Sequence, residues 1–271
     1  MPDLDDAYAN GAYIDGADAF PPRWQSAAAA YRDALGARAQ LGISYGPTER
    51  MAYDLFQPEG ASSGTMIFVH GGYWLKFHRD YWSHLAAGAN ARGWSVAMPS
   101  YDLVPRVRIA GITQQIAQAV THIAANTSGP ITLAGHSAGG HLVARMLAPG
   151  MLHGDVLARV THVVPISPVS DLTPLIRTAM NADFALDPAM ARAESPLHQP
   201  KPSIPVTVRV GADERPAFLD QARWLAEAWE AQHDVVPNLH HFDIIDALKD
   251  PDSGLVQGLT SQRSSVDSSA P

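Results

Sequence analysis

ITLAGHSAGGHLVARML, at residues 131–147, is the stretch of sequence that decides the fold. The apolar residues over 130–134 predict a buried strand, a glycine-rich turn follows, and the apolar residues up to 147 recur at helical spacing. The turn matches the pattern G-x-S-x-G, in which a serine on a strained strand-to-helix turn presents its hydroxyl at the edge of a sheet. Ser137 is therefore the candidate nucleophile. The alternative is a glycine-rich turn that carries no chemistry.

A second glycine turn, His70-Gly71-Gly72, follows the short apolar run at 66–69. Two adjacent glycines let backbone N–H groups approach a substrate oxygen closely, which is what an oxyanion hole requires. The amides of Gly71, Gly72 and Ala138 are the candidate donors, Ala138 because it follows the candidate nucleophile. His70 is expected to hold this loop by hydrogen bonds rather than to act as a base.

Apolar strands and helical segments alternate along the rest of the chain. Strands are expected at 51–57, 66–69, 94–98, 130–134, 160–166 and 205–210, and helices at 24–39, 79–92, 109–125, 138–147, 215–231 and 242–249. This alternation predicts βαβ units, and therefore an α/β fold with a mostly parallel central sheet and helices on both faces.

The domain organisation follows from where the alternation begins and ends. We expect a single domain over 23–256, with a loop-and-helix insertion at 171–200 that is rich in proline and small residues. Residues 1–22 are predicted to form an irregular leader. The serine-rich stretch 257–271 is predicted to be a disordered tail.

Composition excludes several classes of protein. The chain has 271 residues, of which 46% are hydrophobic and 17% charged, as expected for a globular core. It has no cysteine, which excludes a disulfide, a cysteine-ligated zinc and a thiol nucleophile. Its histidines show no metal-binding spacing such as H-E-x-x-H, so no metal or organic cofactor is expected. The net charge of −8, without a basic stripe, argues against a nucleic-acid partner.

The N-terminal sequence bears on localisation. It is acidic and lacks the basic and apolar regions of a signal peptide. No apolar run approaches the ~18 residues needed to span a bilayer. We therefore expect a cytoplasmic protein with no membrane association.

A carboxylate is expected to support the histidine that activates Ser137, in the chain order serine, acid, histidine. The strand predicted over 205–210 runs into Gly211-Ala212-Asp213-Glu214. In such folds the acid often takes the last place of a G-x-x-D/E turn, which favours Glu214. Asp213 remains the alternative acid.

The base is expected on a loop near the C-terminus, after a last strand that is expected to end at Leu239. His240 and His241 precede the helix predicted at 242–249, and we favour His241 because it stands immediately before that helix. His233, in the polar run AQHD, is expected to be exposed at a helix end.

Four segments together resemble the kynurenine formamidase (arylformamidase) family of α/β-hydrolases. They are HGGYW at 70–74, GHSAGG at 135–140, VGADERPAFLDQARWLAEAW at 210–229 and HHFDIIDAL at 240–248; SYDLVP at 100–105 and SPVSDLTPL at 167–175 are also similar. The resemblance covers residues 50–257 and implies a triad of Ser137, His241 and an acid at Glu214. The family usually has aspartate at that position, and glutamate can replace it.

The resemblance implies hydrolysis of the formamide of N-formyl-L-kynurenine, which releases formate and kynurenine in tryptophan breakdown. Relatives with the same motifs hydrolyse aryl or short acyl esters, so a carboxylesterase is the alternative. Tyr73 and Trp74, beside the two glycines, favour a substrate pocket with aromatic walls. Tyr81 and Trp82 are equally well explained by core packing.

A third hypothesis is a non-catalytic binding module that uses the same pocket. The presence of Ser137, His241 and a suitable acid argues against it. The expected partner is a small-molecule amide or ester substrate. A homodimer is compatible with the sequence.

Overall fold

The structure, a computed structural model, describes residues 4–261. Its centre is an eight-stranded sheet in the order β1-β2-β4-β3-β5-β6-β7-β8. The strands are β1 (Ala39–Ser44), β2 (Ala52–Phe56), β3 (Thr65–Val69), β4 (Ser95–Pro99), β5 (Ile131–His136), β6 (Val160–Ile166), β7 (Thr207–Gly211) and β8 (Gln232–Val236). Strand β2 pairs antiparallel with β1 and β4, and all other neighbours are parallel. The predicted mostly parallel α/β fold is confirmed.

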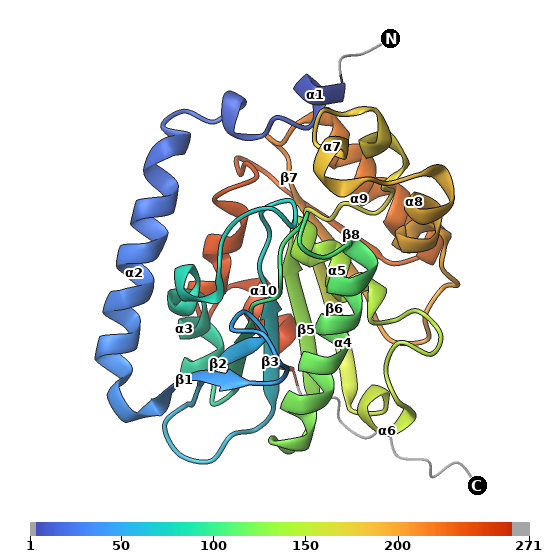
Figure 1. The fold of residues 1–271 in the computed structure, drawn as a ribbon. Helices are drawn as coiled ribbons and strands as arrows, with labels where there is room; N and C mark the ends of the chain where they lie inside the picture. The colour runs from blue at the N-terminus through green and yellow to red at the C-terminus, as the bar shows by residue number, and fades with distance from the viewer. Residues whose placement is uncertain (1–3, 262–271) are drawn as a thin grey trace, which may run out of the picture.

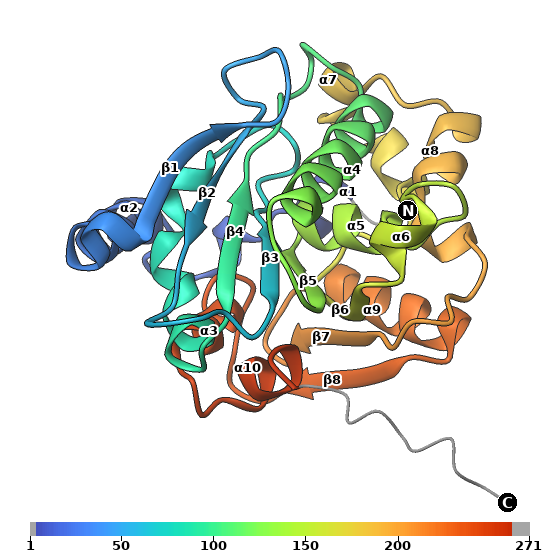
Figure 2. The same cartoon turned by 90° about the horizontal axis from the view of Figure 1, so that it is seen from below.

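Helices cover both faces of this sheet (Figure 2). The helices are α1 (Leu4–Ala7), α2 (Phe20–Leu35), α3 (Ala87–Ala91), α4 (Ile109–Ala125), α5 (Ala138–Arg145), α6 (Gly154–Leu157), α7 (Asn181–Phe184), α8 (Pro188–Glu194), α9 (Pro216–Trp229) and α10 (Gly254–Leu259). One apolar cluster holds α4, α5 and α9 against the sheet, and a second holds α2, α3 and α10 against the other face. No helix in the described part of the chain is long and apolar enough to cross a membrane.

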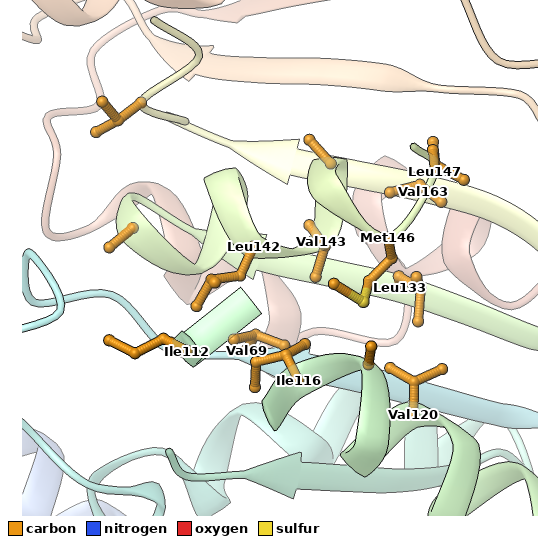
Figure 3. Close-up of a cluster of buried hydrophobic side chains, with 14 of the residues drawn as sticks. Val69, Ile112, Ile116, Val120, Leu133, Leu142, Val143, Met146, Leu147 and Val163 are labelled. Atoms are coloured by element: carbon orange, nitrogen blue, oxygen red, sulfur yellow. The ribbon is translucent and has the colours of Figure 1, made fainter. Parts of the chain in front are cut away.

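The packing between β5, α4 and α5 fixes the position of the glycine-rich turn. Helix α4 buries Ile112, Ile116 and Val120 at intervals of four residues, which places them on one face. They meet Leu133 of β5 and Leu142 of α5 (Figure 3). Burying each such side chain stabilises the fold by about 1.5–3 kcal/mol. The start of α5, where Ser137 lies, is therefore held firmly at the carboxyl end of β5.

The N-terminal residues differ from the expected irregular leader. Residues 4–19 contain α1 and two 3₁₀ turns, and α2 begins at Phe20, before the expected start at 24. Pro21 and Pro22 lie in the first turn of α2, where the missing N–H groups would have had no helical partner. Pro21 and Pro22, which were assigned to the leader, therefore lie at the start of a helix.

Of the two edge strands, β1 was not predicted, and β8 ends at Val236 rather than at Leu239, where a last strand was expected to end. The end of the helix expected over 24–39 is instead a 3₁₀ turn that leads into β1, and His233 lies on β8 rather than at a helix end. Strand β8 is largely exposed and polar, so its sequence carries no alternating apolar signal. Pairing with β7, residue by residue from Thr207 and Gln232, creates this strand.

The other helices and loops differ less from those expected from the sequence. The helix expected at 79–92 is divided into two 3₁₀ turns and α3, and the helix expected at 242–249 is a 3₁₀ helix, Ile244–Lys249. The 171–200 segment contains α7, α8 and two further 3₁₀ turns. The first residues of the expected disordered tail belong to α10, and 262–271 lie outside the described residues.

Candidate active site

Ser137 occupies a sharply bent turn between β5 and α5. Its φ of 57° and ψ of −118° are unfavourable for any residue except glycine. A Cβ on Gly135 would lie 2.2 Å from the carbonyl oxygen of Gly139, and a Cβ on Gly139 would lie 2.0 Å from that of Val69. Both positions therefore require glycine, because neighbouring backbone atoms lie too close to leave room for a Cβ. The turn places Ser137 on the wall of a cavity.

His241 and Glu214 form a buried hydrogen-bonded pair. Nδ1 of His241 donates to Oε2 of Glu214 at 2.5 Å, and the Glu214 side chain is fully buried. Oε1 of Glu214 accepts from Ser167 Oγ at 2.5 Å and from the Gly211 amide at 2.9 Å. Because both carboxylate oxygens are held, the imidazole is fixed with Nδ1 as donor, which leaves Nε2 as the acceptor.

The neighbouring carboxylate, Asp213, is exposed and does not meet His241. The turn at Gly211 explains the difference. A Cβ on Gly211 would lie 2.2 Å from the carbonyl oxygen of Leu239, so the chain bends tightly against the histidine loop. This bend returns the Glu214 side chain to the Gly211 amide and to His241.

Gly71 and Gly72 line the same cavity as Ser137. A Cβ on Gly71 would lie 2.9 Å from the Cβ of Ser137, so only glycine allows this approach. Ala138 is the first residue of α5, where backbone N–H groups have no helical acceptor. Within residues 4–261, the amides of Gly71, Gly72 and Ala138 donate no hydrogen bond. Three N–H groups thus remain available beside the serine.

His70 holds the glycine loop in place. Nδ1 of His70 donates to the carbonyl oxygen of Gly71 at 2.8 Å, and its ring stacks on Tyr101 with centroids 4.5 Å apart. Tyr101 Oη donates to the His70 carbonyl oxygen at 2.9 Å. Burial lowers the pKa of His70 to about 3, so its ring is neutral at physiological pH.

His136 is a residue at the site that the sequence reasoning did not single out. Its Nε2 donates to the carbonyl oxygen of His241 at 2.8 Å, and the two rings lie 4.6 Å apart. Burial holds the pKa of His136 well below its usual value, so the ring stays neutral. It anchors the loop that carries His241. No local signal reveals this bond, because the two residues are 105 positions apart.

The cavity beside Ser137 has a volume of about 510 Å³. His241 and the glycine loop form part of its wall, and aromatic side chains form much of the rest: Tyr8, Trp24, Tyr73, Phe77, Trp82 and Phe242. Tyr8 belongs to the N-terminal residues expected to form a leader, and Trp24 to the helix expected over 24–39. Trp82 is also at the cavity, whereas Tyr81 is not among its lining residues.

Trp74 corrects one expectation. It is fully buried and packs edge-on against His141 and Phe184, so it does not line the cavity. Tyr73 and Trp74 both have positive φ, at 52° and 57°. This unusual turn directs Tyr73 toward the cavity and Trp74 into the core.

Within residues 4–261, no three His, Asp or Glu side chains gather as metal ligands would. The parallel sheet, the serine turn and the buried His–Glu pair are the arrangement typical of one class of protein, the hydrolases built on this sheet. The chain belongs to the alpha/beta hydrolase family, whose model matches residues 66–262.

Several known hydrolases are similar to this chain in sequence or in structure. The chain is 27% identical over 237 residues to the kynurenine formamidase of Salmo salar, covering 82% of this chain and 81% of that protein. A crystal structure from Silicibacter sp. TM1040, provisionally described as a thioesterase, is 57% identical with a TM-score of 0.95, covering 96% of this chain and all of that one. Esterase B of Lactobacillus rhamnosis shares the fold, with a TM-score of 0.63, 19% identity, and coverage of 89% and 91%. The chain is thus a hydrolase similar to kynurenine formamidases.

Proposed function

We propose that the chain is a serine hydrolase that cleaves the formamide of N-formyl-L-kynurenine. The observation that carries this proposal is that Ser137 and His241, which is hydrogen-bonded to Glu214, line one cavity with aromatic walls. Sequence similarity to kynurenine formamidases supports the choice of substrate.

The proposed reaction has two steps. In the first, Ser137 Oγ attacks the formyl carbon while Nε2 of His241 accepts its proton, and Glu214 stabilises the resulting imidazolium. The amides of Gly71, Gly72 and Ala138 stabilise the negative oxygen, a contribution of roughly 3–4 kcal/mol per donor when one is removed. His241 then gives its proton to the departing amine, and the formyl group remains on the serine.

In the second step, water takes the place of the amine. His241 accepts a proton from the water, the new oxygen bonds to the formyl carbon, and the bond to Ser137 Oγ breaks. Formate leaves and the serine regains its proton. Because a formyl group carries only hydrogen, nearly all of the cavity of about 510 Å³ is available to the aromatic leaving group.

Ester or thioester hydrolysis is the second candidate. The same serine, histidine and amide donors would perform it, and the 57% identical structure is provisionally described as a thioesterase. Which acyl bond is preferred depends on how well the leaving group fits the aromatic walls.

The test compares kcat/KM on N-formylkynurenine, p-nitrophenyl acetate and an acetyl thioester. We expect the formamide to be the best substrate, and Ser137→Ala to lose at least about 10³-fold activity on all three. The exposed Ser128→Ala is the matched control and should be fully active. Full activity of Ser137→Ala would refute the mechanism. Turnover of esters or thioesters without the formamide would select the second candidate.

A further inference from the structure

The N-terminal segment, residues 4–24, forms the roof of the cavity. It crosses above the carboxyl ends of the strands between α7 and α2 (Figure 1). Two hydrogen bonds attach it at Tyr8: Tyr73 Oη donates to the Tyr8 carbonyl oxygen at 2.7 Å, and Gln221 Nε2 donates to Tyr8 Oη at 2.8 Å. The amide of Ala179 donates to Asp5 at 2.6 Å. The segment is therefore a fixed wall of the site.

Asn10 is the unusual residue in this roof. The residue is only 6% exposed, and its Oδ1 has no hydrogen-bond partner within residues 4–261. Leaving such a buried amide oxygen without a donor is unfavourable. Asn10 also lines the cavity beside Ser137. This oxygen is inaccessible in the present side-chain position, so the side chain must turn toward the cavity for the N–H donor of a ligand to satisfy it.

The position of Asn10 indicates which half of the substrate it meets. A second, polar hollow of about 230 Å³ lies behind the His–Glu pair, and Asn10 and His241 line both hollows. Asn10 is therefore on the His241 side of the main cavity. Since His241 hands its proton to the departing group, Asn10 borders the leaving-group half.

Charged residues at the same cavity carry both signs. Asp18 belongs to the N-terminal segment and Lys76 follows the glycine loop, and both are exposed at the cavity. Neither forms an ion pair with another residue of the range 4–261. A carboxylate and an ammonium on one cavity rim are complementary to the two ends of an α-amino acid.

We propose that Asn10, Asp18 and Lys76 bind an α-amino acid group on the leaving half of the substrate. Asn10 Oδ1 and Asp18 accept from the ammonium, and Lys76 contacts the carboxylate. Asn10 contributes most, because a buried hydrogen bond to a charged group is stronger than an exposed ion pair. This assignment rests on the proposed function, since it divides the substrate at the formamide bond.

Direct binding tests the assignment without requiring turnover. The probes are kynurenine and 2-aminoacetophenone, which shares its aryl ketone but lacks the amino acid group, titrated calorimetrically. Wild-type protein should bind kynurenine more tightly. Asn10→Ala should raise the Kd of kynurenine about tenfold or more and change that of 2-aminoacetophenone less than twofold. Asn10→Asp, which keeps an acceptor, should retain kynurenine binding, and the exposed Asn126→Ala is the control.

A second binding test uses Lys76→Met. Lys76 is exposed, so the substitution should not affect folding. It should weaken kynurenine two- to fivefold and leave kynurenine methyl ester unchanged, because the ester lacks the carboxylate. Equal weakening of both probes by Asn10→Ala, or equal wild-type affinity for both, would overturn the inference. Absence of N-formylkynurenine turnover alongside Asn10-dependent kynurenine binding would instead refute only the proposed function.

Discussion

Glu214 shows how one side chain can hold two elements together. One carboxylate oxygen meets His241, and the other meets Ser167 and the amide of Gly211. The acid therefore orients the imidazole and is itself oriented by the end of β7. Removing its charge should affect the chemistry far more than the fold.

Glu214→Gln should lower kcat/KM by roughly 10³–10⁴-fold, because an amide cannot stabilise the imidazolium as a carboxylate does. Asp213→Asn, at the exposed neighbour, should remain within twofold of wild type. Steady-state kinetics with melting temperatures checks both variants. The reverse ranking would transfer the acid role to Asp213.

Individual site residues could be predicted from sequence to different extents. The G-x-S-x-G pattern points to Ser137 because the chemistry and the steric demand share one short segment. Trp74 was expected at the pocket but lies in the core, since a turn with consecutive positive φ directs Tyr73 rather than Trp74 toward the cavity. Asn10 was not foreseen, because its burial depends on the packing of the roof.

At the scale of elements, the β5–turn–α5 unit depends on glycine. The Cβ that Gly139→Ala introduces would lie 2.0 Å from the Val69 carbonyl oxygen, a rigid backbone atom of β3. We expect destabilisation by about 3 kcal/mol or more, together with loss of activity. Gly154→Ala meets no atom within 4 Å and should be nearly neutral. Urea unfolding measures the free energy of unfolding of the two variants. Equal values would contradict the close-packing argument.

Elements with buried, apolar sequences were predicted closely. Helix α4 and strand β6 begin and end at the expected residues, 109–125 and 160–166. Strand β1 escaped prediction, and the end of β8 was misplaced at Leu239, because edge pairing, rather than apolar alternation, makes them strands. The start of α2 was misjudged because prolines in a first helical turn look like a loop.

At the scale of the whole molecule, several histidines are buried in the neutral form. Burial lowers the pKa of His70 to about 3 and that of His141 to about 4. In the unfolded chain both would titrate near 6.5. Their neutral burial therefore contributes stability above pH 6.5, and that contribution is lost as the pH falls toward 4 and then 3.

The free energy of unfolding should thus fall between pH 7.5 and pH 5.0, by about 2 kcal/mol for each such histidine. His141→Gln should reduce this fall by about that amount, whereas the exposed His153→Gln should leave it unchanged. Denaturant unfolding at the two pH values measures the difference. A fall of the same size in all three proteins would remove His141 as a cause.

The cavity roof and the proposed catalytic groups come from separate stretches of the chain. Residues 4–24 contribute the roof, while Ser137, Glu214 and His241 lie on loops after β5, β7 and β8. Sequence changes confined to this N-terminal stretch would therefore alter substrate selectivity while the loops after β5, β7 and β8 stay unchanged. A library of chimaeras that vary only this stretch would be an economical route to new substrates.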